Sequence, residues 1–176
     1  MIRVRLATAW LSGCSGCHMS LLNLHGGLLE LFESCDLVYT PLADIKEYPQ
    51  EVDIVLVEGA VANDENREMA QLIRRKTAIV ASLGDCAVNG NITALRNPHG
   101  TQQTLDLVYP GTVRTGDVPR LSATVLPLHQ VIRVDRFIPG CPPLPEHIRQ
   151  AVAELVKERE QALSSSNRNG IHPYQP

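Results

Sequence analysis

The chain has 176 residues, of which 44% are hydrophobic and 20% charged, and its formal net charge is −3. This composition indicates one globular domain with a sizeable core and excludes a disordered chain. The acidic charge balance and the 4% aromatic content argue against a nucleic-acid binder, which needs a basic surface and stacking rings. No apolar run approaches the about 20 residues of a membrane span, and no export signal opens the sequence, so we expect a cytoplasmic protein without a transmembrane segment.

Strands and helices alternate along most of the chain. Near-continuous apolar runs are typical of parallel strands that are buried on both faces, and apolar residues at helical spacing follow them. Prolines and glycines interrupt the segment 89–130, which we expect to be mostly irregular. The expected strands are 2–9, 37–40, 52–57, 77–83 and 131–138, and the expected helices are 18–32, with a bend or close packing at its two glycines, 64–75, and a last one that begins near Pro145.

This alternation predicts an α/β fold in which helices cover both faces of a parallel sheet. We expect one domain over 1–163, followed by a flexible, serine-rich tail at 164–176. In such sheets, ligands bind beyond the carboxyl ends of the strands. The residues that follow each strand are therefore the first candidates for a functional site.

Four of the five cysteines follow the ends of predicted strands. Cys14 and Cys17 come after the first strand, Cys86 after the fourth and Cys141 after the fifth. Because the carboxyl ends of parallel strands meet at one edge of a sheet, we expect these four thiols to lie close together. Cys35 lies between a helix and a strand, away from this edge, and we expect it to be a small core residue. An odd number of cysteines without a secretory signal makes a disulfide framework a poor explanation.

Four thiolates from three loops suit either zinc or an iron–sulfur cluster. Structural zinc sites commonly use two close ligand pairs, whereas only Cys14 and Cys17 are close here. The step Cys141–Pro142 is also found in ferredoxin-type cluster sites. These features favour one 4Fe-4S cluster, and zinc remains the alternative. A thioredoxin-like pair fits less well because two further loop cysteines would be unexplained, and no glycine-rich phosphate-binding motif is present.

Two polar residues accompany the cysteines. Glu58 ends a buried strand at the same edge, and taken alone it is more simply interpreted as a solvated carboxylate before a turn. His18 adjoins Cys17, where it is either a hydrogen-bond donor near the metal ligands or the first exposed position of its helix.

The segments that carry these residues form a recognisable set. They are GCSGCHMSLL at 13–22, VEGAV at 57–61, GDCA at 84–87 and FIPGCPP at 137–143. In this order and spacing they resemble the small subunit of nickel–iron hydrogenases over nearly the whole chain, above all that of the cytoplasmic, bidirectional, NAD-linked enzymes of cyanobacteria and other bacteria. The related 20 kDa-type subunit of respiratory complex I has adjacent cysteines in the first motif, so the spacing here favours the hydrogenase branch.

The resemblance implies a flavodoxin-like, three-layer fold with Cys14, Cys17, Cys86 and Cys141 as the ligands of one proximal 4Fe-4S cluster. It also implies a hetero-oligomer. The nickel–iron centre would lie in a large partner subunit, and electrons would pass through this chain to a diaphorase with flavin and further clusters that reduces NAD. This chain would then contain no catalytic residue of its own. The export signal and the C-terminal two-cluster domain of the periplasmic and membrane-bound enzymes have no counterpart in the sequence.

Within this resemblance, further residues become candidates. Gly13, Gly16, Gly84 and Gly140 would let the loop backbone approach the sulfurs closely, since no side chain intervenes. Glu58 becomes a candidate for polar contacts or a proton path near the subunit interface.

Alternatives for the partner and for the metal stay open at this point. The chain could serve a coenzyme F420-linked or ferredoxin-linked hydrogenase, or a complex I-like module, because the electron acceptor binds elsewhere. A non-redox, zinc-binding adaptor is the alternative from another class.

Overall fold

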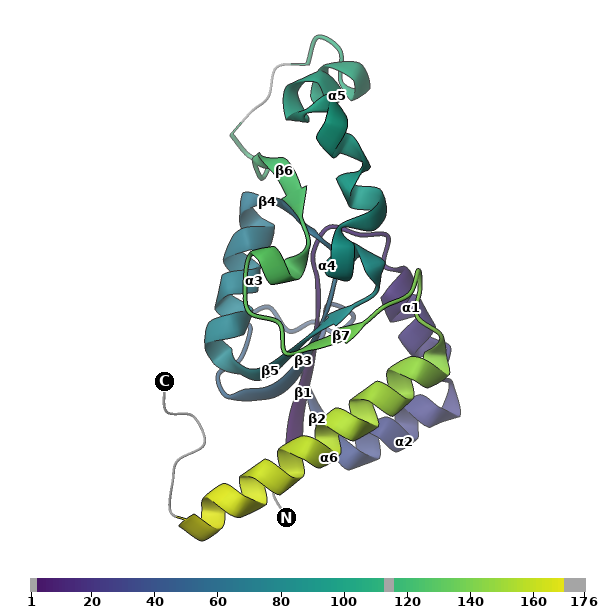
Figure 1. The fold of residues 1–176 in the computed structure, drawn as a ribbon, viewed down its shortest axis with the longest axis vertical. Coiled ribbons are helices and arrows are strands. Elements are labelled where there is room, and N and C mark those ends of the chain that lie inside the picture. Colours follow the sequence, from purple (N-terminus) through teal and green to yellow (C-terminus); the bar gives the residue numbers. More distant parts are fainter. Residues whose placement is uncertain (1–2, 113–115, 170–176) are drawn as a thin grey trace.

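A parallel five-stranded sheet forms the centre of the molecule (Figure 1). The computed structural model describes residues 3–112 and 116–169, with side chains described up to Ser165. The strand order β2-β1-β3-β5-β7 is the flavodoxin-like order, in which the chain first runs outward and then reverses across the first strand. The strands are β1 (Val4–Trp10), β2 (Cys35–Tyr39), β3 (Val52–Glu58), β5 (Thr77–Leu83) and β7 (Arg136–Ile138).

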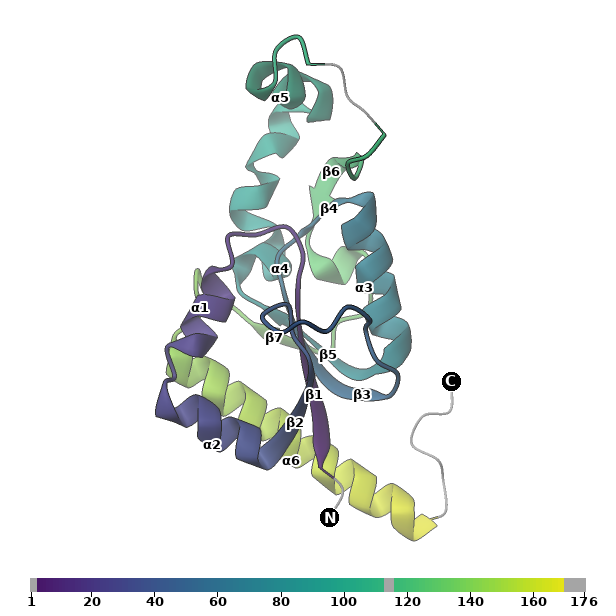
Figure 2. The same cartoon turned by 180° about the vertical axis from the view of Figure 1, so that it is seen from behind.

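Helices cover both faces of this sheet, as Figures 1 and 2 show from opposite sides. Successive side chains of a strand point to opposite faces, so Ile54 and Leu56 of β3 enter one core while Val55 and Val57 enter the other. The predicted α/β fold with three layers and a parallel sheet is confirmed. One face is covered by α1 (Gly16–Leu22), α2 (Gly26–Ser34) and α6 (Pro145–Asn169), and the other by α3 (Asp64–Lys76), α4 (Asp85–Asn89) and the 3-10 turn η2 (Leu128–Gln130).

A small lobe extends beyond the carboxyl ends of the strands, at the top of Figure 1. It consists of η1 (Asn91–His99), α5 (Thr101–Val108) and an antiparallel pair of β4 (Val61–Asn63) with β6 (Leu121–Leu126). The expectation of a mostly irregular segment at 89–130 is therefore wrong. Side chains hold the lobe together: Arg96 donates to the carbonyls of Ala62 and Ser122.

One predicted helix and one predicted strand have other boundaries in the structure. The helix expected at 18–32 is two helices, α1 and α2, separated by a turn in which His25 has a φ of 49°. The strand expected at 131–138 is only the three residues of β7.

The last helix is longer than predicted. The helix α6 continues to Asn169, into the tail predicted at 164–176, and the remainder of that tail lies outside the described residues. In the last described turns of the helix, Ser165 donates its hydroxyl to the carbonyl of Ala162, three residues earlier.

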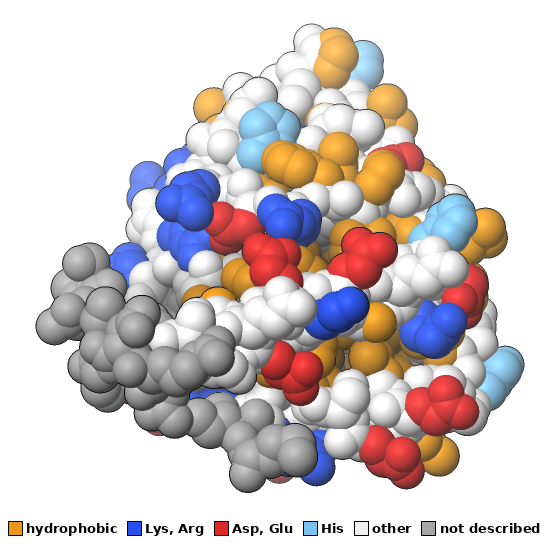
Figure 3. Space-filling model, turned by 60° about the horizontal axis from the view of Figure 1, so that its bottom comes forward, with side chains coloured by type: hydrophobic (Ala, Val, Ile, Leu, Met, Phe, Trp, Pro, Cys, Tyr) orange, Lys and Arg blue, Asp and Glu red, His pale blue; other side chains and the backbone are white. Residues whose placement is uncertain are grey.

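The surface is mixed in charge where α6 crosses it. Acidic and basic side chains are interspersed on the face drawn in Figure 3, as is usual for a solvated surface. None of the helices within the described residues is long and apolar enough to cross a membrane.

Candidate metal centre

The structure places the four strand-end cysteines at one edge of the sheet. Cys14 lies in the loop after β1, Cys17 in α1, Cys86 in α4 after β5, and Cys141 in the loop after β7. Cys14 and Cys141 are exposed, Cys86 is half-buried and Cys17 is buried. The site therefore opens at the surface while one of its thiols is anchored in the core.

The other three thiols of this edge lie close enough to Cys17 to affect its ionisation. Burial raises the pKa of the Cys17 thiol to about 12, and the negative charges of Glu58, Cys14, Cys86 and Cys141 add to this shift. A thiolate at Cys17 therefore needs a compensating positive charge, which bound metal ions supply.

The arrangement does not converge on a single point. Among the described residues, no group of three or more His, Cys, Asp or Glu side chains is placed to hold one metal ion. This geometry is compatible with a 4Fe-4S cluster, in which each thiolate binds a different iron.

Gly84 forms a cradle for the sulfur of Cys17. A Cβ atom built on Gly84 would overlap Sγ of Cys17, and the φ of 80° at this position also favours glycine. A Cβ on Gly16 would lie 3.2 Å from Sγ of Cys14. Two of the four candidate glycines thus lie directly against cysteine sulfurs, which fits a bulky inorganic group held close to the backbone.

The other two candidate glycines serve the packing of the loops. A Cβ on Gly13 would lie 3.3 Å from Cα of Gly59, and one on Gly140 would lie 2.6 Å from Cα of Pro143. The N–H of Gly140 donates to Oδ1 of Asp85 at 2.7 Å. The backbone N–H of Gly140 therefore points at the carboxylate of Asp85.

Backbone hydrogen bonds join the loops of Cys86 and Cys141. The N–H of Gly84 donates to the carbonyl of Ile138 at 2.8 Å, and the N–H of Asp85 donates to the carbonyl of Gly140 at 2.9 Å. Together with the Asp85 carboxylate on Gly140, these contacts fix the two loops relative to each other.

Glu58 is buried beside the first cysteine loop, with 3% of its surface exposed. The interpretation as a solvated carboxylate is therefore wrong. Its Oε1 accepts a hydrogen bond from the N–H of Cys17 at 3.3 Å, and its Oε2 accepts one from the N–H of His18 at 3.0 Å. Burial alone would raise the pKa of the Glu58 carboxyl, but these bonds and the contact with the His18 ring lower it below its usual value.

His18 is fully buried, so the alternative of an exposed helix position is also wrong. Its Nδ1 lies 2.5 Å from Oε2 of Glu58, and its ring meets the Trp10 ring edge-on with the centroids 5.1 Å apart. Both residues thus fix the start of α1, where Cys17 lies.

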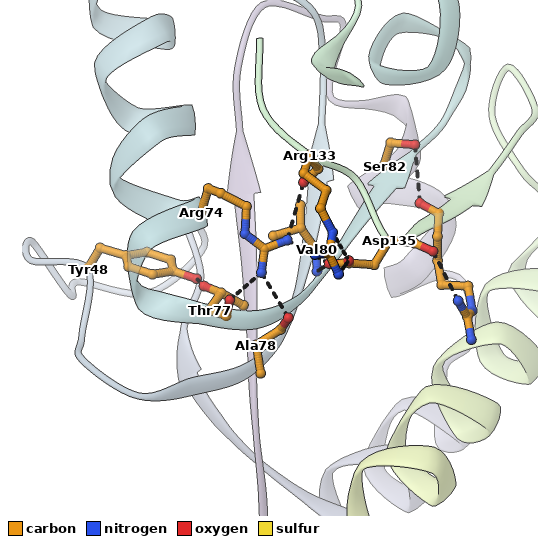
Figure 4. Close-up of polar contacts among 9 residues, drawn as sticks. Tyr48, Arg74, Thr77, Ala78, Val80, Ser82, Arg133 and Asp135 are labelled. Atoms are coloured by element: carbon orange, nitrogen blue, oxygen red, sulfur yellow. Dashed lines mark hydrogen bonds and ion pairs between the residues drawn. The ribbon is translucent and has the colours of Figure 1, made fainter. Parts of the chain in front are cut away.

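A polar network outside the cysteine loops holds β7 in place (Figure 4). Oδ2 of Asp135 accepts from the N–H of Val80 at 2.8 Å and from Nη1 of Arg74 at 2.6 Å. Arg74 also donates to the carbonyls of Thr77 and Ala78, at the start of β5. Since β7 has only three residues, this network adds to its pairing with β5 in fixing where the chain enters the loop of Cys141.

Sequence reasoning missed Asn91, which begins η1. Its Nδ2 donates to Sγ of Cys141 at 3.2 Å. An asparagine in an Asn-Gly-Asn turn carries no motif that points to such a contact. Cys35 behaves as predicted: it is 1% exposed and its thiol donates to the carbonyl of Leu31, so it is a core residue.

The model of the NADH ubiquinone oxidoreductase 20 Kd subunit family matches residues 14–155, which include all four cysteines of the site. The chain belongs to this family. Its homologues in the family include hydrogenase small subunits, which confirms the resemblance inferred from the motifs.

Two relatives illustrate the similarity. The NAD-reducing hydrogenase HoxS subunit delta of Cupriavidus necator is 37% identical over 175 residues, which cover 93% of this chain and 84% of that protein. A subunit of the F420-non-reducing hydrogenase of Methanothermobacter marburgensis is 38% identical over 176 residues, which cover 94% of this chain. The chain spans only 57% of the length of that second relative.

A solved structure agrees with the fold over nearly its full length. One chain in the crystal structure of an NAD+-reducing NiFe-hydrogenase in the H2-reduced state is 36% identical, with a TM-score of 0.84. The alignment covers 99% of this chain and 96% of that one. The strand-end loops that carry the cysteines are thus part of a fold that the family shares.

Proposed function

We propose that the chain is the electron-transfer small subunit of a bidirectional nickel–iron hydrogenase that reduces NAD. Cys14, Cys17, Cys86 and Cys141 would hold one proximal 4Fe-4S cluster. The observation that carries this proposal is the gathering of these four thiols from three strand-end loops at one edge of the sheet. The similarity to an NAD-reducing hydrogenase subunit supports it.

Different residues of the site would contribute to cluster binding in different ways. A bound 4Fe-4S cluster would supply one-electron transfer. Gly84 leaves room for the sulfur of Cys17, and the hydrogen bonds between Asp85 and Gly140 keep the loops of Cys86 and Cys141 in register. Preorganised ligands of this kind reduce the movement of the protein when an electron arrives.

The open side of the site would face the large subunit with the nickel–iron centre. Cys14 and Cys141 are exposed there, and Met19 and Leu144, which lie close in sequence to the cysteines, are 49% and 62% exposed. Apolar side chains beside an exposed metal site are typical of a surface that a partner covers. The electrons would then leave through flavin-containing diaphorase subunits, in a cytoplasmic complex.

We also propose that Glu58 acts by polar contacts at this site. It holds the backbone of Cys17 and His18, so its carboxylate orders the loop that carries two of the four ligands. A proton path through Glu58 stays a prediction. Unchanged hydrogen turnover together with an unchanged cluster spectrum in Glu58→Gln would refute both roles.

One observation favours ferredoxin, in place of NAD, as the electron acceptor. Relatives named as parts of F420-non-reducing hydrogenases are as similar in sequence as the NAD-reducing one. The NAD-reducing relative is covered over 84% of its length, against 57% for the relative from Methanothermobacter marburgensis, and we therefore give NAD precedence. Hydrogen-dependent reduction of ferredoxin without reduction of NAD would decide for the second acceptor.

Co-expression with a candidate large subunit and diaphorase subunits tests the proposal. We expect the chain to co-purify with them, to contain iron and acid-labile sulfide, and to support hydrogen-dependent NAD reduction. Serine at Cys14, Cys17, Cys86 or Cys141 should abolish the low-spin signal of the reduced cluster, whereas Cys35→Ala, the matched control, should retain it. Zinc without acid-labile sulfide in the wild-type chain would contradict the proposal.

A further inference from the structure

The first turn of η1 contacts the segments that carry the cysteines. η1 follows α4 directly, and the N–H of Gly90, which caps the end of α4, donates to the carbonyl of Cys86 at 3.0 Å. Oγ1 of Thr93 donates to the carbonyl of Ser12 at 3.1 Å, just before the loop of Cys14. The small lobe is thus attached directly to the site, although it lies outside the sheet.

Asn91, in the same turn, reaches the third loop. Its Nδ2 donates to Sγ of Cys141 at 3.2 Å. Among the described residues, this amide is the one side-chain donor to a sulfur of the four cysteines. The contact therefore sets Cys141 apart from the other three ligands.

The backbone directs this amide at the sulfur. Asn91 has a φ of 33°, which asparagine tolerates better than most residues, and its own N–H donates to Oδ1 of Asn89 at 2.9 Å. The side chain is thus held by local geometry rather than by burial.

We propose that Asn91 raises the reduction potential of the cluster through this hydrogen bond. The inference rests on the proposed function, in which Cys141 is a cluster ligand. Reduction adds negative charge to the cluster and its sulfurs, and a donor on a ligand sulfur stabilises the more negative state. Asn91 is a positioning residue in this sense, since it acts through the sulfur of Cys141 and not on the reacting hydrogen.

The test is an EPR-monitored redox titration of the full chain, purified anaerobically. Asn91→Gly removes the donor and tolerates the backbone conformation, and it should shift the equilibrium toward the oxidised cluster by about tenfold, which is about 59 mV more negative for one electron. Asn91→Asp keeps the shape but replaces the donor with a charge, so its potential should fall further. Ile92→Ala is the matched control in the same turn, and its potential should equal that of the wild type.

The outcomes separate this inference from the proposed function. A wild-type chain without iron and sulfide overturns the proposed function and the inference with it. A cluster that is present but has the same potential in Asn91→Gly and wild type overturns the inference alone. Loss of the cluster in Asn91→Gly, with the cluster intact in Ile92→Ala, also overturns it, because Asn91 would then be needed to build the site rather than to set its potential.

Discussion

The carboxylate of Glu58 caps the first turn of α1, in which His18 lies. Oε2 of Glu58 lies 2.5 Å from Nδ1 of His18 and accepts the N–H of the same residue, and both side chains are buried. Ser15, at the usual capping position of α1, makes no side-chain cap. A carboxylate from the neighbouring strand β3 thus satisfies backbone donors at the start of α1, where negative charge is also favourable for the helix dipole.

Replacing this carboxylate should destabilise the protein. In Glu58→Ala, the N–H groups of Cys17 and His18 and the ring of His18 lose their acceptor inside the protein, so we expect the free energy of unfolding to fall by about 3 kcal/mol. Glu58→Gln keeps an acceptor of the same shape and should lose less. Urea denaturation of the two variants measures the difference, and equal stabilities of Glu58→Ala and wild type would contradict this account.

Gly84 should be essential for metal binding rather than for folding as such. In Gly84→Ala, the new methyl group would overlap Sγ of Cys17, so we expect a large loss of bound iron. Gly100 is the matched control, because its φ of 75° is close to the 80° of Gly84 while no atom lies within 4 Å of its built Cβ. Gly100→Ala carries a similar backbone penalty of about 1–3 kcal/mol, because both glycines also have a ψ near 160°, and it should keep its iron. Iron analysis of both variants provides the comparison, which fails if they lose metal equally.

The side chain of Asp85 should order the loop of Cys141. Its Oδ1 accepts the N–H of Gly140, but two backbone hydrogen bonds join the same loops. We therefore expect Asp85→Ala to cost about 1 kcal/mol in stability and to broaden the spectrum of the bound cluster without abolishing it. Thermal melts and EPR line shapes measure the two effects; an unbroadened spectrum would show that the backbone contacts suffice.

The placement of the four cysteines could be predicted because it follows from strand polarity. The apolar run of β3 and the position of each thiol just after a strand are local features of the sequence, and a parallel sheet brings such positions to one edge. The burial of Glu58 could not be derived in the same way. It depends on His18, which lies 40 positions away in the sequence and faces Glu58 only after the sheet has formed.

The small lobe escaped prediction for a related reason. Its strands β4 and β6 have three and six residues, and the partner of Val61 is Leu126, far along the chain. Short strands without alternation carry little local signal, and here Arg96 and Asn97 hold them through contacts with backbone carbonyls. Asn91 belongs to this lobe, so its contact with Cys141 could not be predicted from the sequence either.

Asp135 should make the stability of the protein depend on acid pH. Burial would raise the pKa of its carboxyl, but hydrogen bonds from the N–H of Val80 and from the guanidinium groups of Arg74 and Arg133 outweigh burial and lower it below the usual 3.8. Because the folded protein binds this proton more weakly than the unfolded chain, Asp135 stabilises the fold above about pH 4, and this contribution is lost as the pH falls through the lower, folded-state pKa.

Asp135→Asn should therefore be less stable than the wild type by about 1–2 kcal/mol at pH 7, and the difference should shrink toward pH 3. Urea denaturation at pH 7, 5 and 3 measures this convergence. Asp36→Asn is the control, since the ion pair of Asp36 with Arg3 is half-exposed and should contribute little at any pH. A constant difference between Asp135→Asn and wild type across this range would mean that the carboxylate holds β7 by shape and not by charge.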